Sequence, residues 1–219
     1  MSALFPRWTN TFARVAAVSA VGVPVVALSA VMLLQRTPYV TNQHVELVQP
    51  IQFDHRHHNW EEGIDCRFCH AQVETSATAG IPATSLCMGC HAQVFNKSPR
   101  LEPLRQAYFS KTPVAWKRVH DLPDFVYFNH SIHVRKGVGC VTCHGRVDRM
   151  PMVYQAEPLT MQWCVDCHRA PQQHLRPLDA VTDMQWQAPV SAAQRAELGQ
   201  RLAQANDVHP RTACDTCPR

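Results

Sequence analysis

Cys140-Val141-Thr142-Cys143-His144 is one of four Cys-x-x-Cys-His segments in this chain of 219 residues. In this motif the two thiols add across the vinyl groups of a haem, and the adjacent histidine reaches the iron as an axial ligand. The sequence therefore predicts four covalently attached c-type haems, numbered haem 1 to haem 4 in chain order. The predicted attachment cysteines and proximal histidines are Cys66, Cys69, His70, Cys87, Cys90, His91, Cys140, Cys143, His144, Cys164, Cys167 and His168.

Zinc is the competing interpretation of the paired cysteines. Zinc ribbons also use two Cys-x-x-Cys pairs roughly 15–20 residues apart, and here 17 residues lie between Cys69 and Cys87 and 20 between Cys143 and Cys164. The histidines favour haem, because histidine accounts for only 13 of the 219 residues. Chance would place one after all four pairs only about once in 10⁵ sequences, and a four-cysteine zinc site needs no such histidine.

A fifth cysteine pair departs from this pattern. Cys214 and Cys217 are followed by Pro218, which offers no side-chain ligand for iron. Because one of the three parts of the attachment signature is missing, we expect a disulfide or two free thiols there. The alternative is a fifth haem held by two thioethers, with an unusual axial ligand such as His209.

The N-terminal segment is long and apolar enough to cross a membrane. Residues 15–34 are uncharged and mostly apolar, and as a helix they would span about 30 Å, the thickness of a bilayer core. Arg7 and Arg14 precede this run, so the positive-inside tendency places the N-terminus in the cytoplasm. We expect a retained single-pass anchor in a bacterial inner membrane, with a cleaved signal peptide as the alternative. In both cases the haem domain lies on the periplasmic side.

The rest of the chain has the composition of a domain that packs around cofactors. The sequence contains 16 prolines and only four tyrosines, and no strand-like alternation persists for long. Such a chain would bury little core of its own. The predicted fold is therefore mostly irregular, with short α-helices packed on haems. The formal charge of +4 is mild, and no cluster of lysine or arginine suggests a nucleic-acid partner.

The haem motifs belong to an internal repeat. Phe53-x-His55-x-x-His58 precedes the first motif, and the same pattern, from Phe128 to His133, precedes the third at an offset of 75 residues. The haem motifs themselves recur at offsets of 74 and 77. This pattern indicates duplication of a two-haem module, at about residues 53–91 and 128–168. The proline-containing segment between the modules is expected to be irregular.

The repeated histidine pairs match the number of distal ligands that four six-coordinate irons require. Two imidazoles three residues apart on a helical turn share a face and can reach two different haems. We therefore predict His55, His58, His130 and His133 as distal ligands, whereas the competing interpretation is that each is a surface histidine. Irons ligated in this way have no open position for a substrate. The pattern thus favours electron transfer and predicts no catalytic residue.

Other side chains are weaker candidates for ligands. His57 could replace His58 through a shift in register, and His120, just before the second module, is the best additional ligand. Met88 and Met161 lie close to haem motifs, but a methionine beside an apolar cofactor more often packs than ligates. The remaining histidines, each expected at the surface or in a hydrogen bond, are His44, His174 and His209.

The second histidine pattern, Phe128–His133, together with the haem 3 motif, resembles the signature of the class III cytochromes c and their three-haem relatives. In that family the first histidine of the pair ligates the haem attached just downstream, and the second serves another haem. The resemblance implies a class III-like multihaem fold in which His130 serves haem 3 and His55 serves haem 1. It leaves His58 and His133 to other haems, with haem 2 and haem 4 as the candidates.

A closer resemblance covers most of the chain. The N-terminal anchor and the stretches Gln49–Phe53, Ala79–Cys90 and Arg118–His130 are similar to the membrane-anchored multihaem cytochrome c subunit of alternative complex III, which oxidises quinol. The resemblance implies quinol-oxidising and iron–sulfur subunits as partners, and a periplasmic cytochrome c or an oxidase as acceptor. Subunits of that family carry five haems, and His120 matches the distal ligand of the fifth. Pro218, in place of the fifth histidine, sets this chain apart.

Two rival functions stay open on the sequence alone. A tetrahaem quinol dehydrogenase that feeds periplasmic reductases also has one anchor and four haems, but works without a large complex. An enzyme that reduces a small nitrogen or sulfur compound needs a five-coordinate haem, whereas this chain offers at least as many spare histidines as irons.

The expected organisation has five parts. Residues 1–36 form the cytoplasmic N-terminus and the anchor, 37–52 a linker, 53–127 the first two-haem module with its linker, 128–175 the second two-haem module, and 176–219 a C-terminal helix and tail. Within the last part, Ser191-Ala192-Ala193-Gln194 has the form of a capping box, which predicts a helix that continues to about Ala205.

Overall fold

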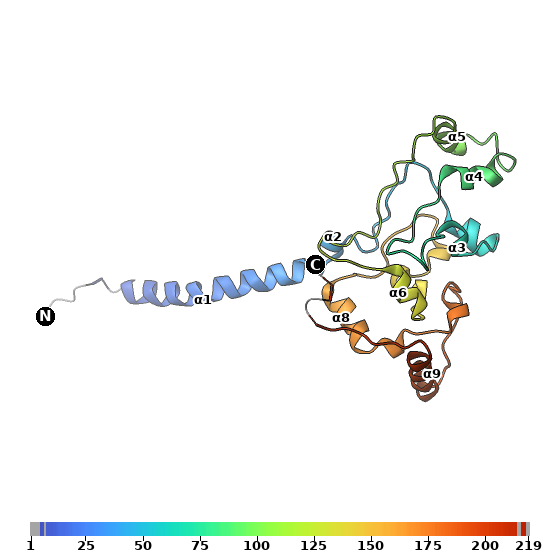
Figure 1. The fold of residues 1–219 in the computed structure, drawn as a ribbon. Helices are drawn as coiled ribbons and strands as arrows, with labels where there is room; N and C mark the ends of the chain where they lie inside the picture. Colours follow the sequence, from blue (N-terminus) through green and yellow to red (C-terminus); the bar gives the residue numbers. More distant parts are fainter. Residues whose placement is uncertain (1–4, 7, 214–215, 218–219) are drawn as a thin grey trace. The chain divides into compact units, whose positions relative to one another are not determined.

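The computed structural model describes residues 5–6, 8–213 and 216–217, and the chain divides into two units. The first unit is Met1–Asn42 and the second is Gln43–Arg219 (Figure 1). Some sequence-based expectations concern Arg7, Cys214 and Pro218, which lie outside the described residues.

The first unit consists mainly of one long helix, α1, from Trp8 to Leu34, followed by the single turn α2, Pro38–Thr41. Within α1 an 18-residue window has a mean hydropathy of 2.3, and none of that window is buried. The helix is therefore long and apolar enough to cross a membrane, although a signal sequence would meet the same criteria. Pro24 lies inside α1, a position that membrane helices tolerate.

The second unit consists of short helices joined by irregular segments, and its described residues form no β-strand. Only two isolated bridges occur among them, Gln43–Gln155 and Val138–Leu175. The helical segments are η1 (Arg56–Glu61), α3 (Cys66–Cys69), α4 (Thr84–His91), η2 (Pro99–Leu101), α5 (Glu102–Phe109), α6 (His130–Arg135), α7 (Cys140–His144), η3 (Val147–Arg149), α8 (Met161–Arg169), η4 (Pro171–Gln173), η5 (Leu178–Ala180) and α9 (Ala192–Ala205).

The segment between the two modules is not irregular throughout, and that prediction was wrong. It contains η2 and α5, which begin with Pro99 and Glu102–Pro103. Proline fits the first turn of a helix, because the N–H that it lacks would have no partner inside the helix in any case. These two prolines therefore start helical turns, and α5 buries Leu104.

The protein core of the second unit is small and divided. One cluster of buried residues joins Ile51, Met88 and Leu104, so Met88 packs as the sequence predicted. The other cluster joins Val73, Val134 and Val181 and is extended by Ala79 and Cys140. Two clusters of this size leave much of the interior to be filled by other apolar groups, which is what a chain that packs on haems requires.

Helix α9 packs on the short turn η4. A side chain at Gly199 would collide with the backbone oxygen of Gln172, so glycine allows this close approach. Lys136 Nζ donates a hydrogen bond to the backbone oxygen of Asp207 at 2.6 Å, just beyond the end of α9. The predicted helix and its end at Ala205 are confirmed, but Ser191 forms no side-chain capping bond, so the predicted capping box is wrong.

Candidate haem sites

Each Cys-x-x-Cys pair of the four motifs lies on a short helix, α3, α4, α7 or α8. Two cysteines three residues apart on such a turn share a face, as two bonds to one flat ring require. Local sequence helps to set these turns. The side chain of Thr160 accepts a hydrogen bond from the backbone N–H of Trp163 at the start of α8. Helix α7 is capped at its C-terminal end by Gly145, whose φ of 64° favours glycine.

The two repeated histidine patterns adopt the same local arrangement. Phe53 packs edge-on against His55, with 4.7 Å between ring centroids, and nearly parallel to His58 at 4.3 Å. In the second copy, Phe128 lies 4.8 and 4.5 Å from the two corresponding rings, again edge-on to the first and closer to parallel with the second. The sequence repeat is therefore also a structural repeat at its histidine pairs.

Three of the predicted distal histidines each face a predicted proximal histidine. The ring-centroid separations are 6.1 Å for His58–His91, 6.0 Å for His133–His168 and 6.3 Å for His130–His144. An imidazole nitrogen binds a metal at about 2 Å, so two such bonds and the two ring radii together span about 6 Å. The spacing of all three pairs therefore suits one iron between the rings.

Six of the eight predicted ligands orient their rings through Nδ1. In each case Nδ1 lies within hydrogen-bonding distance of a backbone carbonyl oxygen, which fixes the tautomer and leaves Nε2 for a metal. The histidines, their carbonyl partners and the distances are His58–Asp54 at 2.9 Å, His70–Gly80 at 2.7 Å, His91–Val94 at 3.1 Å, His130–Ala77 at 2.9 Å, His133–Asn129 at 2.8 Å and His168–Arg211 at 2.7 Å.

The other two predicted ligands, His55 and His144, lie in a cluster of histidines. Burial lowers the pKa of His55 to about 4, and the neighbouring His70 contributes to the same effect. Burial also lowers the pKa of His144 to about 3, with smaller contributions from His120 and His130. These rings are therefore neutral near pH 7, which is the form of imidazole that binds metals.

His120 belongs to this cluster as well. Its ring centroid lies 4.3 Å from that of His144, with the rings at 70° to each other, which is too close for an iron between them. Its Nε2 is buried and has no hydrogen-bond partner, and burial lowers its pKa to about 4. The structure thus places His120 beside the proximal histidine of haem 3.

Other histidines use the nitrogens that a ligand would need. His57 Nδ1 lies 2.7 Å from the Glu61 carboxylate, and this partner raises the pKa of His57. His209 places Nε2 2.7 Å from the Asp207 carboxylate. The structure therefore turns His58 rather than His57 toward a haem motif. His44 packs against Tyr154, and His174 lines a cavity.

The described cysteines form no disulfide and no zinc-ribbon tetrahedron. Burial raises the pKa of Cys66 and of Cys143 to about 12, so these thiols are neutral. Within the described parts of the chain, no three His, Cys, Asp or Glu side chains meet where one ion could be held. In the fifth pair, Cys217 lies close enough to Cys164 to contribute to its raised pKa. The residues present fit a haem better than a zinc ion.

Sequence reasoning missed Arg176. This side chain is 6% exposed, and its Nε has no hydrogen-bond partner. The guanidinium occupies the space that a side chain at Gly139, directly before Cys140, would need. It donates to the backbone oxygen of Asp183 at 2.9 Å and lies over the ring of Trp186. A single arginine outside every motif gives no sequence signal, because only the fold brings it to the haem 3 segment.

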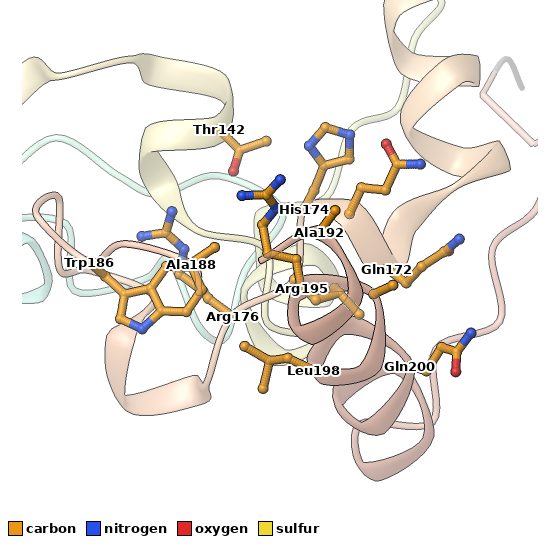
Figure 2. Close-up of a pocket in the computed structure, with 13 residues that line it drawn as sticks. Thr142, Gln172, His174, Arg176, Trp186, Ala188, Ala192, Arg195, Leu198 and Gln200 are labelled. Atoms are coloured by element: carbon orange, nitrogen blue, oxygen red, sulfur yellow. The ribbon is translucent and has the colours of Figure 1, made fainter. Parts of the chain in front are cut away.

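A cavity of about 670 Å³ lies beside the same segment. It is lined by Thr142 of α7, by the stretch 172–176 and by residues of α9, and Figure 2 shows Arg176 and Arg195 among its lining side chains. Its walls do not include the predicted haem ligands or cysteines.

Comparisons with known proteins agree with the chemistry of these sites. Residues 126–218, which contain the second histidine pair and the haem 3 and haem 4 motifs, match the family described as cytochrome c7 and related cytochrome c. Over 148 residues the chain is 30% identical to the menaquinone reductase, multiheme cytochrome c subunit, of Nitratidesulfovibrio vulgaris, a match that covers 58% of this chain and 70% of that protein.

Proposed function

Because this chain belongs to the multihaem cytochromes c, with a cytochrome c7-like fold and covalently bound haem c, we propose that it is the electron-transfer subunit of a quinone-linked membrane complex of the alternative complex III type. In this role it relays electrons from quinol oxidation to a periplasmic cytochrome c or a terminal oxidase. The chain itself contributes no catalytic residue. It holds redox centres in place and tunes them through ligands, burial and hydrogen bonds.

The observation that supports this function most is the pairing of histidine rings at 6.0 to 6.3 Å in both modules. An iron held between two imidazoles has no open position for a substrate. Full coordination suits one-electron transfer, whereas a reductase that acts at a haem needs a vacant side.

We propose four haem c groups with bis-histidine ligation. The three facing pairs support the ligands of haems 2, 3 and 4, and for haem 1 the support is that His70 lies close enough to His55 to help lower its pKa. The proposed sets are Cys66, Cys69, His70 and His55 for haem 1; Cys87, Cys90, His91 and His58 for haem 2; Cys140, Cys143, His144 and His130 for haem 3; and Cys164, Cys167, His168 and His133 for haem 4.

The fifth cysteine pair is proposed to carry no haem. Pro218 stands in place of the expected histidine, and the alternative ligand, His209, already places Nε2 against a carboxylate. The role proposed for Cys214 and Cys217 is a disulfide or a pair of free thiols.

The remaining proposals concern the organisation of the chain. Helix α1 acts as a retained anchor in the bacterial inner membrane, and the haem domain lies on the periplasmic side. The two-haem modules fall within residues 53–127 and 128–175, after a linker at 37–52, and residues 176–219 close the haem domain. The partners are quinol-oxidising and iron–sulfur subunits of the same complex.

The intact mass and the electron paramagnetic resonance (EPR) spectrum of the purified full-length chain test the haem sites. We expect a mass gain of four haems and low-spin signals only. A gain of five haems contradicts the proposal for the fifth cysteine pair. A high-spin haem that binds cyanide or nitrite favours an enzyme that reduces a small nitrogen or sulfur compound at that haem.

A second candidate is the reverse direction of electron flow, which is favoured by the name of the relative as a menaquinone reductase. Purification of the complex in mild detergent, followed by assays with a quinol or with a reduced cytochrome and a quinone, separates the two directions. Isolation of the chain without large partners contradicts the complex and favours a separate quinol dehydrogenase.

A further inference from the structure

Resting on the haem sites proposed above, we propose that electrons do not pass through the haems in chain order. The path runs from haem 2 to haem 1, then to haem 3 and haem 4. The two modules are joined through their first haems, and their second haems form the two ends of the path.

The first cysteines of the two modules are held by consecutive residues of one segment. The backbone N–H of Cys140 donates to the backbone oxygen of Val181 at 3.1 Å. The thiol of Cys66 lies 4.0 Å from the backbone oxygen of Thr182, and the hydroxyl of Thr182 donates to Asp65, the residue before Cys66, at 2.9 Å. The attachment points of haem 1 and haem 3 are therefore neighbours in space.

The distal ligand of haem 3 is also fixed by the first module. The ring Nδ1 of His130 lies 2.9 Å from the backbone oxygen of Ala77, and the backbone N–H groups of His130 and Ser131 donate to Ala77 and Ser76, both at 3.1 Å. Residues 76 and 77 belong to the connection between the haem 1 and haem 2 motifs. The segment that leaves haem 1 thus positions a ligand of haem 3.

The two proposed axial ligands of haem 3 lie at the same boundary. The rings of His130 and His144 are 6.3 Å apart, and His130 is held by the backbone of Ala77 in the first module. Apolar packing also joins the two modules here. Val73 of the first module and Val134 of the second belong to one core cluster, and Cys140 packs at its edge. The haem 1 and haem 3 segments are therefore packed together at the module boundary.

Within each module, the second haem lies next to the first. In the second module, His130 faces His144 of haem 3, and His133 on the same turn faces His168 of haem 4. In the first module, His58 faces His91 of haem 2, and His55 of the same pattern is the proposed ligand of haem 1. The two histidines of each repeated pattern serve the two haems of that module and share one phenylalanine.

A deletion experiment in the full-length protein separates this path from chain order. In a Cys214→Ser, Cys217→Ser background, a ruthenium photoreductant is attached at Val94→Cys, an exposed position three residues after His91. A His133→Met change makes haem 4 spectrally distinct, and flash photolysis follows the arrival of electrons there. The haem 1 attachment site is then removed by Cys66→Ser and Cys69→Ser.

The proposed path predicts that removal of haem 1 slows transfer from haem 2 to haem 4 by more than an order of magnitude. A path in chain order predicts little change, because haem 2 would still lead to haem 3. As the matched control, the photoreductant is placed at Thr75→Cys, an exposed position five residues after His70 of haem 1, and haem 2 is removed by Cys87→Ser and Cys90→Ser. We expect transfer to haem 4 to persist in this control, whereas chain order predicts that it stops.

Measuring the haem content distinguishes a failure of the proposed path from a failure of the proposed haem sites. Fewer than four haems in the parent protein contradict the proposed sites, whereas four haems with transfer that survives the loss of haem 1 overturn the path alone. If a deletion variant does not fold, redox titration of His55→Met replaces it. The proposed path predicts that raising the potential of haem 1 also shifts the potential of haem 3, and an unchanged haem 3 overturns it.

Discussion

His133 on α6 faces His168 on α8 across 6.0 Å between ring centroids, and the corresponding residues of the first repeat, His58 and His91, are 6.1 Å apart. In both modules, therefore, the second histidine of the repeated pattern meets the second haem motif of its own module. The duplicated sequence has kept not only the residues but also the distance that an iron between two imidazoles requires.

Replacing His58 by alanine should leave one of the four irons without its sixth ligand. We expect a high-spin signal from about a quarter of the haem, with cyanide binding to that fraction, because the neighbouring rings are committed to other irons. EPR spectra of the oxidised protein measure this change. The matched control is His57→Ala, whose exposed ring pairs with Glu61; low-spin spectra in both variants would contradict the assignment.

Replacing Arg176 by glutamine should lower the reduction potential of one haem, assigned here as haem 3. A buried positive charge beside the Cys140 segment favours the reduced iron, which carries one positive charge fewer. A tenfold change in the ratio of oxidised to reduced haem corresponds to about 59 mV for one electron, and we expect a shift of up to this size in a spectroscopic redox titration. Arg176→Lys keeps the charge and should keep most of the potential. Equal shifts in both variants would indicate a structural role alone.

Trp60 links the two modules through cation–π contacts. The guanidinium of Arg149 lies 3.7 Å above its ring, and that of Arg146 lies 5.7 Å away. Trp60→Ala should destabilise the haem domain by about 1–3 kcal/mol, since the contacts and part of the packing are lost together. Thermal unfolding measures this loss, and Trp60→Phe, which keeps an aromatic face, should recover a part of it. No difference between the alanine variant and the parent would show that the contact does not stabilise the protein.

Gly199→Ala should destabilise the protein although alanine is the better helix former. In a solvent-exposed helix, replacing glycine by alanine stabilises the helix by about 1 kcal/mol. Here the new methyl group would collide with the backbone of Gln172, and overpacking costs about 1–3 kcal/mol. Gln200→Ala, at the exposed neighbouring position, should stay within about 0.5 kcal/mol of the parent. A more stable Gly199→Ala protein would mean that α9 does not pack this closely.

Lowering the pH should reduce the free energy of unfolding of the haem domain over a defined range. His120, which is not among the proposed iron ligands, takes up a proton near pH 6.5 in the unfolded chain, whereas burial lowers its folded pKa to about 4. Between these values the unfolded state binds more protons, so stability falls as the pH drops from about 6.5 toward 4 and is highest above 6.5. Denaturant unfolding at several pH values, followed by the low-spin haem spectrum, measures this trend. Stability that rises on acidification across this range would contradict it.

Most of the candidate site could be predicted from the sequence because the chemistry imposes residue types at fixed spacings. Two thioethers and an axial ligand require Cys-x-x-Cys-His, and a distal ligand requires another histidine. The duplication then showed that His55 and His130, which would look like ordinary surface residues alone, occur in the same position twice. The small protein core and the short helices could be predicted from the composition for the same reason, since the haems replace apolar side chains.

What the sequence could not predict depends on contacts between distant segments. Nothing near Arg176 in the sequence indicates that it lies beside Gly139, and nothing near His120 places it against His144. The prolines of the segment between the modules predict irregular structure, although Pro99 starts a helical turn. The capping box at Ser191 failed because a matching sequence does not ensure that the side chain makes the bond.

The segment around Val181 and Thr182, which holds the first cysteines of both modules, has a consequence for biogenesis. Once it is in place, the sulfur of Cys66 and the backbone of Cys140 lie against it and both residues are only partly exposed, which leaves less room for a bulky porphyrin to approach. We therefore expect these two prosthetic groups to be attached before the last fifth of the polypeptide settles, so that the maturation machinery acts on an incompletely folded chain.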